Sequence, residues 1–176
     1  MDAVYIGIDP TAGRRPMDYA VLNDDLELVA RGLGRLEAVL DVVRSYPAAV
    51  VAVDAPQSPN AGLMASPSRR RKYGLSRHDK VWSNYKVCEY ELQRRGIRLY
   101  STPGEIEAAP LWMQIGFQLY GALKKDGYRM YRPGLSAARR LIEVHPHASY
   151  TVLLGHLPLR KDSLEGRLQR QLVLHE

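Results

Sequence analysis

The stretch Val4-Tyr5-Ile6-Gly7-Ile8-Asp9-Pro10, near the start of the chain, decides its fold class. An uninterrupted run of β-branched, aromatic and glycine residues leads directly into an aspartate and a proline. Short runs of this kind that end in Asp-Pro are typical of a buried strand followed by a turn. The sequence therefore predicts a first strand that carries the carboxylate of Asp9 to the edge of a sheet.

A second stretch repeats the same pattern. Ala48-Ala49-Val50-Val51-Ala52-Val53 is continuously apolar and leads into Asp54-Ala55-Pro56. Continuous apolar runs of this length are typical of central strands that are covered on both faces of a sheet. Central strands of α/β sheets deliver side chains to the edge at which such folds bind ligands. We therefore expect Asp54 to lie near Asp9.

The rest of the chain alternates between strand and helix patterns. The elements that these patterns predict are, in order, strands 19–22 and 26–30, helix 36–43, a basic loop at about 56–79, helix 80–95, strand 97–100, helix 106–125, strand 141–145, and helices 147–154 and 163–175. A hairpin-led sheet followed by alternating helices and strands indicates a mixed α/β layer fold. We expect one domain over 1–176, in which an antiparallel three-strand meander is followed by parallel strands and flanked by helices.

Composition limits the classes of protein to which the chain can belong. Its 176 residues carry a formal net charge of +6 and are 45% apolar, enough for one core and compatible with an acidic partner such as nucleic acid. The single cysteine, Cys88, excludes an intrachain disulfide and argues against a cysteine-based zinc cluster. We expect no signal peptide and no membrane span, because the sequence has neither a basic-then-apolar leader nor an apolar run of ~20 residues. These features favour a reducing, cytoplasmic setting.

Glu143-Val144-His145 adds a third acid and a histidine. Residues two apart on a strand share a face, so Glu143 and His145 are expected to point the same way. A histidine beside an acidic site orients a water or a phosphate, or transfers a proton near neutral pH. A histidine that caps the following helix is an equal alternative. Zinc ranks low, because no third soft ligand accompanies His145 and His147.

Converging carboxylates require a partner of opposite charge. Close carboxylates repel one another, so a proton or a cation must neutralise them. Magnesium and manganese prefer oxygen ligands, and a pair of such ions activates a water and stabilises the leaving oxygen in phosphodiester cleavage. Asp9, Asp54 and Glu143 are therefore the candidate metal ligands, and with His145 they are the candidate catalytic residues. For any one acid alone, a turn-capping or solvated carboxylate is the alternative.

A run of cations, Arg69-Arg70-Arg71-Lys72, lies in the predicted loop. Contacts of Lys and Arg with phosphate supply most non-specific affinity for nucleic acid, which favours a nucleic-acid-binding role over a merely solvated loop. Trp82 and Tyr85 could stack on unpaired bases, but burial on the following helix is the favoured interpretation. Thr11 lies in a glycine-containing turn that could hold phosphate, although an ordinary hairpin connection explains this turn better.

Several segments together resemble a known family. They are, in chain order, Gly7-Ile8-Asp9, Val53-Asp54-Ala55-Pro56, Cys88-Glu89, Glu143-Val144-His145-Pro146, and Lys161 with Glu165-Gly166-Arg167 and Arg170. Their order and spacing resemble domain of unknown function 429, a family described as predicted nucleases with a ribonuclease H-like fold. The resemblance implies that Asp9 and Asp54 are the first two metal-binding acids and that Glu143 is the third. It also implies that Glu89 faces the site or pairs with an arginine, and that the late cations Lys161, Arg167 and Arg170 contact phosphate.

The chain departs from this family pattern at its C-terminal end. Members of the family usually continue into a helix with paired aspartates near an alanine-rich stretch, and ribonuclease H-like nucleases commonly place their last metal ligand on such a helix. This sequence reaches Glu176 without one. The expectations are that the chain is truncated, that Glu143 substitutes for the missing ligand, or that the protein does not cleave.

The sequence thus favours a magnesium- or manganese-dependent nuclease that acts on nucleic acid. A non-catalytic nucleic-acid-binding module on the same fold is the alternative that the missing acidic helix motivates. A nucleotide-binding phosphotransferase ranks last: it shares the Gly-Ile-Asp-x-Thr opening of residues 7–11, but such enzymes pair two domains of this size. The oligomeric state is left open, a homodimer included.

Overall fold

The computed structural model describes residues 3–11, 15–76, 78, 80–134 and 136–174. The chain divides into two compact units. The first, which we call the sheet unit, comprises residues 1–61 and 102–144. The second, the helical unit, comprises residues 62–101 and 145–176. The strands of the structure all belong to the sheet unit, as far as the described residues extend.

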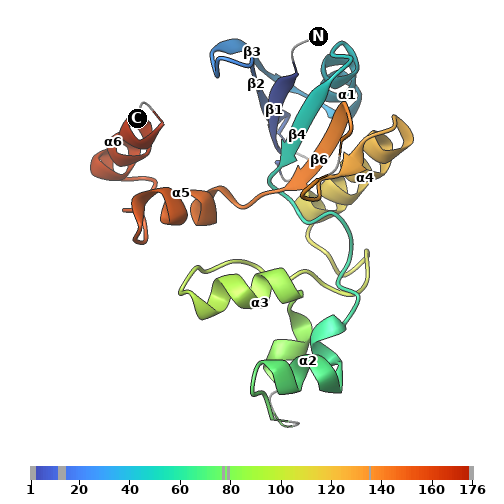
Figure 1. Ribbon diagram of the computed structural model, residues 1–176, viewed down its shortest axis with the longest axis vertical. Helices are drawn as coiled ribbons and strands as arrows, with labels where there is room; N and C mark the ends of the chain where they lie inside the picture. The colour runs from blue at the N-terminus through green and yellow to red at the C-terminus, as the bar shows by residue number, and fades with distance from the viewer. Residues whose placement is uncertain (1–2, 12–14, 77, 79, 135, 175–176) are drawn as a thin grey trace. The chain divides into compact units, whose positions relative to one another are not determined.

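The sheet unit is built on a six-stranded mixed sheet with the strand order β3-β2-β1-β4-β6-β5. Strands β1 to β3 form an antiparallel meander, and β4, β6 and β5 continue the sheet as parallel strands. The strand bounds are β1 Val4–Asp9, β2 Met17–Leu22, β3 Leu28–Gly34, β4 Ala49–Val53, β5 Arg129–Met130 and β6 Arg139–Glu143. This is the mixed sheet that the sequence predicts, and Figure 1 shows β1, β4 and β6 side by side.

Alternation along the central strands gives the sheet a buried face and an exposed face. On β1, Ile8 is buried, whereas Tyr5, Gly7 and Asp9 are exposed. Ile8 pairs with Val53 on the parallel strand β4, and Val53 is fully buried. Because register neighbours share a face, the apolar side chains of the two strands form one continuous surface. We call the side that carries Tyr5, Gly7 and Asp9 the exposed face.

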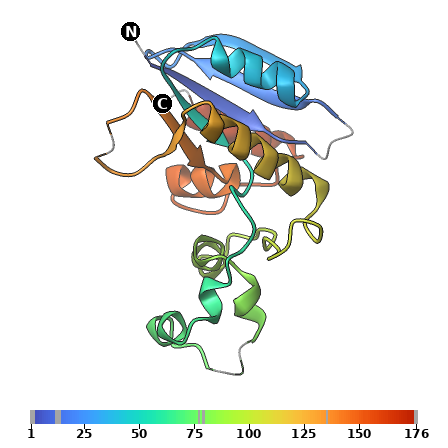
Figure 2. The same cartoon turned by 90° about the vertical axis from the view of Figure 1, so that its right-hand side faces the viewer.

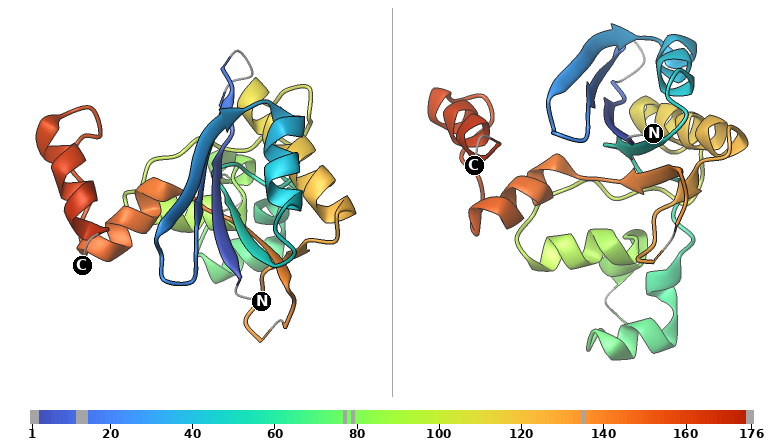
Figure 3. Two further views of the ribbon diagram at one scale, coloured as in Figure 1. Left: turned by 90° about the horizontal axis from the view of Figure 1, so that it is seen from above. Right: turned by 45° about the horizontal axis from the view of Figure 1, so that its top comes forward.

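Two helices cover the buried face. Helix α1 (Leu36–Arg44) and helix α4 (Leu111–Lys125) lie on the same side of the sheet, as Figures 2 and 3 show. In each helix the buried side chains recur at helical spacing and so form one stripe that faces the strands. The core residues of these elements include Ile6, Ile8, Val51, Val53 and Leu141 on the sheet, Val39, Leu40 and Val43 on α1, and Leu119, Tyr120 and Leu123 on α4.

Gly116 allows α4 to approach the segment that follows β4. A Cβ atom at this position would lie 2.6 Å from the Cβ of Ala55 and 3.5 Å from the carbonyl oxygen of Pro56. Glycine in a helix interior costs up to about 1 kcal/mol relative to alanine, so its presence here calls for a packing reason. The close approach supplies that reason, and it sets the position of the chain directly after Asp54.

The predicted loop at about 56–79 is wrong in its central part. Residues Leu63–Ala65 form a 3₁₀ turn, η1, and Pro67–Lys72 form helix α2. Helix α2 begins at Pro67, and at the first position of a helix the fixed φ angle and missing N–H of a proline are favourable. The cations that follow are good helix formers, and cations in the last turn of a helix also interact favourably with its dipole.

Other boundaries move because proline and sheet pairing override local pattern. The predicted helix 106–125 begins at Leu111, since Pro110 cannot lie inside a helix. The predicted helix 80–95 is split into a 3₁₀ turn, η2 (Lys80–Asn84), and helix α3 (Val87–Arg94). The predicted strand 97–100 is not formed; these residues belong to no helix or strand of the described part of the chain. Strand β5 was not predicted.

The helical unit contains a small aromatic cluster of its own. Tyr90 on α3 is buried, and its ring packs edge-to-face on Tyr73 and Trp82 with ring centroids 4.9 Å and 5.0 Å away. Trp82 also contacts Tyr85, at 5.7 Å. These aromatic rings therefore pack against one another, as the burial interpretation expected. The remaining helices of this unit are α5 (Pro146–Leu154) and α6 (Leu164–Val173).

Among the helices whose bounds are given above, α4 is the longest. None of the helices in this part of the chain combines the length and the apolar character that crossing a bilayer demands.

Substitution of Gly116 by alanine is expected to destabilise the sheet unit. The added methyl group collides with Ala55, and overpacking of this kind costs about 1–3 kcal/mol, more than the gain in helix propensity. Gly121 in the same helix is the matched control, because it is exposed and a Cβ atom there meets nothing within 4 Å. Urea denaturation should show Gly116→Ala less stable and Gly121→Ala more stable than the parent. Equal shifts of the two variants would contradict the close approach.

Candidate functional site

The two aspartates predicted from the sequence stand beside each other at the carboxyl ends of β1 and β4. Asp9 is the last residue of β1. Asp54 follows β4 directly, and its backbone N–H donates to the carbonyl oxygen of Ile8 at 3.0 Å, so it extends the pairing of the two strands by one residue. Neighbouring strands lie about 4.8 Å apart, which places the two aspartates within reach of one ion.

Both aspartates belong to the exposed face. Ile8 and Val53, the residues that precede them, point into the core. Alternation along the strands therefore directs Asp9 and Asp54 to the opposite side. Asp9 is exposed and Asp54 is half-buried, so the carboxylates meet solvent at the rim of the sheet, where a ligand has access to them.

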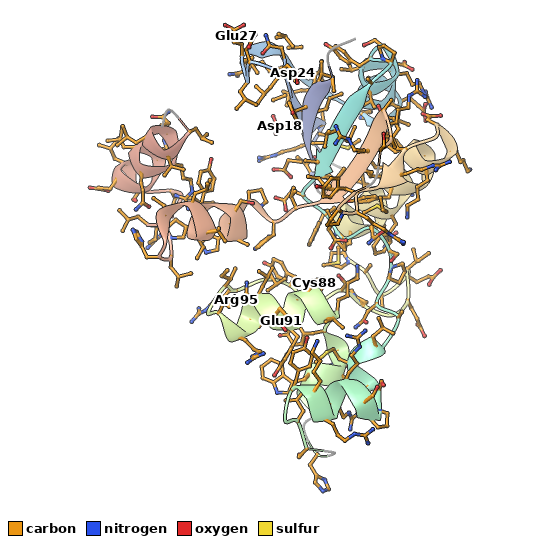
Figure 4. The ribbon with its side chains drawn as sticks, in the orientation of Figure 1. Asp18, Asp24, Glu27, Cys88, Glu91 and Arg95 are labelled. Carbon is orange, nitrogen blue, oxygen red and sulfur yellow. The ribbon has the colours of Figure 1, made fainter. Side chains whose placement is uncertain are left out.

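Asp18 is a third acid beside Asp9 and Asp54, and sequence reasoning missed it. We call these three aspartates the acid row. It is the register partner of Asp9 across the antiparallel pair of β1 and β2, and it is exposed, whereas its neighbour Met17 is buried. Figure 4 labels Asp18 beside the sheet. The alternation of a buried Met17 with an exposed Asp18 was the available signal, but β2 was predicted to begin only at residue 19.

The row of acids borders a row of small residues. Gly7 on β1 pairs with Ala20 on β2 and with Ala52 on β4. A Cβ atom added at Gly7 would meet nothing within 4 Å, so packing does not explain the glycine. Glycine inside a strand often marks a place where a ligand or another backbone comes close. The space directly over Gly7, two residues before Asp9, is thus open.

Glu143 occupies a different position from the one expected. It pairs with Val53 in the register of β4 and β6, so alternation directs it to the buried face, one row before the two aspartates. Its Oε2 atom accepts a hydrogen bond of 3.0 Å from the backbone N–H of Gln57. The carboxylate of Glu143 therefore ties the end of β6 to the segment that follows Asp54.

Across the described residues, no group of three or more His, Cys, Asp and Glu side chains is arranged to hold a metal ion. The donors in the acid row are all carboxylate oxygens, which suit magnesium or manganese better than softer metals. The three-acid centre of Asp9, Asp54 and Glu143 thus stays a prediction. The geometry brings Asp9, Asp54 and Asp18 to one face and Glu143 to the other.

Tyr120 of α4 lies under the same strand ends. Its ring is fully buried, and its hydroxyl donates to the carbonyl oxygen of Ile142 at 3.1 Å. Burial raises the pKa of this hydroxyl far above its ordinary value, and the negative charges of Glu143 and Asp54 raise it further. Tyr120 consequently stays protonated and acts as a fixed donor. Local sequence pattern gave no sign that Tyr120 lies near the acids.

Thr11 and His145 flank the acid row in sequence. The hydroxyl of Thr11 donates to the backbone of Arg15 and lies 3.1 Å from the carbonyl oxygen of Pro16, so it closes the turn between β1 and β2. This agrees with an ordinary hairpin connection; residues 12–14 of that turn lie outside the described residues. His145 lies beyond β6, which ends at Glu143, and it holds the N-cap position of α5 without a side-chain capping bond.

The other predicted site residues belong to the helical unit. Arg69 and Arg70 are half-buried on α2, whereas Arg71 and Lys72 are exposed. Glu89 is buried on α3, and its Oε2 atom accepts the N–H of Lys86 at 2.8 Å, which is a helix-capping role. The late cations Lys161 and Arg167 are exposed.

The Asp18→Asn variant is expected to be more stable than the parent without metal and to gain less stability than the parent when metal is added. Like charges directly opposite on paired strands cost about 0.2–1 kcal/mol, so the variant should be more stable than the parent in EDTA. A bound cation stabilises the state that binds it, so added Mn²⁺ should raise the melting temperature of the parent more than that of the variant.

Glu105→Gln is the control, because Glu105 is an exposed acid of the same unit outside the row. Equal responses of all three proteins to Mn²⁺ would show that the row does not bind the ion.

Comparison with known proteins gives one assignment. Neither curated proteins nor solved structures provide a match to the chain. A family described as protein of unknown function (DUF429) matches residues 7–176, which includes the acid-bearing ends of β1, β4 and β6. Because the match spans nearly the whole chain, the protein belongs to the DUF429 family.

Proposed function

We propose that this protein is a magnesium- or manganese-dependent nuclease that hydrolyses phosphodiester bonds of nucleic acid. The observation that carries the proposal is the pair Asp9 and Asp54, which end neighbouring parallel strands on the exposed face. Asp18 extends this pair across the hairpin. Carboxyl ends of parallel strands are the usual position of ligand sites in α/β sheets.

The proximity of the carboxylates supports a cation as their partner. Asp9 and Asp18 are direct register partners, and like charges in such a pair repel. The register positions beside Asp9 on its two neighbouring strands are held by the acids Asp18 and Asp54. A hard divalent ion fits an all-carboxylate set of donors.

Each residue then has a distinct task. Asp9 and Asp54 hold the ion, with Asp18 able to hold one of its waters. When bound, the ion supplies Lewis-acid polarisation of phosphate and a water of lowered pKa. The low surface over Gly7 lets a phosphodiester backbone approach the carboxylates. Glu143, as a positioning residue, fixes the segment after Asp54 through Gln57.

The helical unit supplies the attraction for nucleic acid in this proposal. Its helix α2 carries Arg69, Arg70, Arg71 and Lys72, and the last two are exposed. The formal net charge of +6 acts in the same direction. Because the aromatic rings of this unit pack against one another, contact through phosphate is favoured over stacking on bases. A reducing cytoplasmic compartment belongs to the same proposal, as does His145 as a group that transfers a proton.

A non-catalytic nucleic-acid-binding module is the second candidate. The observation that favours it is the position of Glu143, which the register directs away from the exposed face and whose carboxylate accepts a hydrogen bond from the backbone N–H of Gln57. In that case binding requires the cations of α2 but neither the aspartates nor a metal.

Asp9→Asn is expected to reduce Mn²⁺-dependent cleavage by at least about 100-fold, because loss of a metal ligand costs more than loss of a group that merely orients one. The assay uses single-stranded, duplex and hybrid substrates with purified full-length protein. Gly7→Val should also abolish cleavage while the fold stays intact by circular dichroism, since the new side chain fills only the space over the acids.

Asp25→Asn, an exposed acid of the turn between β2 and β3, serves as the control and should cleave like the parent. Cleavage that is equal in Asp9→Asn and the parent, or no cleavage by the parent on any substrate, would refute the nuclease proposal. Binding without cleavage that persists in EDTA would leave the non-catalytic module as the function.

Replacement of Arg71 and Lys72 by alanine is expected to weaken binding of nucleic acid at all sequences alike. Each lost phosphate contact lowers the slope of log K against log salt by about 0.9, so the double variant should show a slope smaller by about 2. Lys124→Ala/Lys125→Ala, which removes the cations from the last turn of α4, is the matched control. Fluorescence anisotropy over a series of salt concentrations gives both slopes. Identical slopes for the α2 variant and the parent would remove α2 from the binding surface.

A further inference from the structure

Two arginines stand side by side where β5 and β6 end the sheet. Arg129 of β5 and Arg140 of β6 are register partners in the parallel pairing of these strands. Paired strands lie about 4.8 Å apart, so the two side chains start from adjacent positions. Guanidinium groups keep their charge in proteins, and two of them at this spacing repel each other. We call these residues the arginine pair, and their repulsion favours a negatively charged partner.

The arginine pair belongs to the exposed face of the sheet. Leu141 is fully buried, so alternation along β6 directs Arg140, which precedes it, to the opposite side. Arg129 is exposed and precedes Met130, which packs against the core. The same alternation directs Arg129 away from the core. The pair therefore shares a face with the acid row.

The sheet unit provides no counter-ion for the pair within the part of the chain that the structure describes. Neither Arg129 nor Arg140 takes part in an ion pair there. The Nε atom of Arg140 is buried and has no hydrogen-bond partner among the same residues. Buried donors are hydrogen-bonded in nearly all proteins, so a donor of this kind indicates a group that a ligand supplies.

The neighbouring arginine shows how a structural role differs. Arg139 belongs to the other face, where its Nη1 atom donates to the carbonyl oxygen of Asp126 at 2.7 Å and its Nε atom donates to that of Pro47 at 3.4 Å. Its guanidinium also lies over the ring of Tyr128, 5.8 Å from the centroid. Arg139 thus ties β6 to the surrounding chain. Arg140 makes no such contact with the described residues, so packing does not explain its charge.

The register fixes the separation between the arginine pair and the acid row. Arg140 pairs with Val50 of β4, which is four residues before Asp54 and on the same face. A strand rises about 3.3 Å per residue, so about 13 Å of sheet lies between the pair and the acids. Gly7 and Ala52, which are register partners, occupy the row between them, and the space over Gly7 is open. One strand of nucleic acid, with a phosphate at every nucleotide, spans this separation.

We propose that Arg129 and Arg140 bind a backbone phosphate of the same nucleic-acid strand whose scissile phosphate lies at the acid row. This inference rests on the proposed function and adds the path of the substrate, which crosses the exposed face over Gly7 toward β5. The planar fork of an arginine matches the oxygens of a phosphate and binds them in bidentate fashion. The phosphate neutralises the repulsion within the pair. Contact with phosphate carries no sequence information, so the site holds any sequence.

The first arm of the test measures binding to the full chain in EDTA. Fluorescence anisotropy of a labelled single-stranded oligonucleotide should show weaker binding by Arg129→Gln/Arg140→Gln than by the parent. The slope of log K against log salt should fall by about 0.7, the contribution of one phosphate contact on a single strand. Arg35→Gln is the matched control, because Arg35 is exposed and precedes α1 on the other side of the sheet. It should bind like the parent.

The second arm locates the phosphate by cleavage in Mn²⁺. The substrates are oligonucleotides in which one linkage at a time is an uncharged methylphosphonate. A neutral linkage at one fixed distance from the cleaved bond should slow cleavage by the parent several-fold. The same linkage should have no effect on Arg129→Gln/Arg140→Gln, because that variant has already lost the contact. Neutral linkages at other positions should affect the two proteins alike.

The melting temperature of the chain without nucleic acid separates a binding role from a structural one. Arg129→Gln should be as stable as the parent or more stable, because it removes one of two repelling charges. A lower melting temperature of this variant would show that the charge is structural and would overturn the inference. If Arg140→Gln impairs folding, Arg129→Gln alone decides the binding arm.

The two proposals fail in different ways. Equal binding and equal salt slopes for the parent and Arg129→Gln/Arg140→Gln would overturn the inference, and so would a linkage effect that persists in this variant. Cleavage by the parent would leave the nuclease proposal intact in either case. A parent that binds but cuts nothing would refute the nuclease proposal and with it the position of the scissile phosphate, whereas the binding arm would still accept or reject the arginine pair.

Discussion

The parallel pairing of β1 with β4 is the constraint on which the sheet unit depends. Its register sets Ile8 against Val53 in the core. The same register sets Asp9 beside Asp54 on the exposed face, because the side chains of a strand alternate. A shift by one residue would expose the apolar side chains and bury the aspartates together. The burial of apolar residues therefore fixes the position of the acids without any direct interaction between them.

Magnitudes explain why the fold tolerates a row of like charges. The repulsion of Asp9 and Asp18 costs about 0.2–1 kcal/mol as a cross-strand pair. Full burial of a single isoleucine or valine contributes about 1.5–3 kcal/mol, and the core beneath the row contains several. The sheet can thus hold the acids together at a small cost in stability. A bound cation would turn this local cost into a gain, which is the basis of the proposed function.

The parts of the site that the sequence predicted are those that depend on local pattern. Asp9 and Asp54 each follow an apolar run, so both strands and both acids could be predicted from neighbouring residues alone. The face of Glu143 could not, because it depends on the pairing of β6 with β4, two segments far apart in the chain. Residues 97–100 have strand-like composition but belong to no strand of the structure, because local composition alone does not form a sheet. Asp18 was lost through an error of two residues at the start of β2.

The same distinction applies to the helical elements. Helix α2 was missed inside the predicted basic loop, and its first residue, Pro67, favours a helix only because it lies at the first position. The glycines at 116 and 166 have ordinary neighbours in the sequence, and only the tertiary structure reveals the backbone and side-chain groups that exclude a Cβ atom. Packing between distant segments thus decides which glycines are required, whereas local pattern decides where most strands and helices lie.

The most direct measurement of the central claim is the position of a bound metal. Crystals of the full-length protein soaked in Mn²⁺ allow the ion to be located by its anomalous scattering. The account predicts a peak on the exposed face, in contact with the carboxylates of Asp9 and Asp54 at the carboxyl ends of β1 and β4. An ion bound elsewhere, or no ion at this pair of aspartates in crystals that are saturated with Mn²⁺, would contradict it.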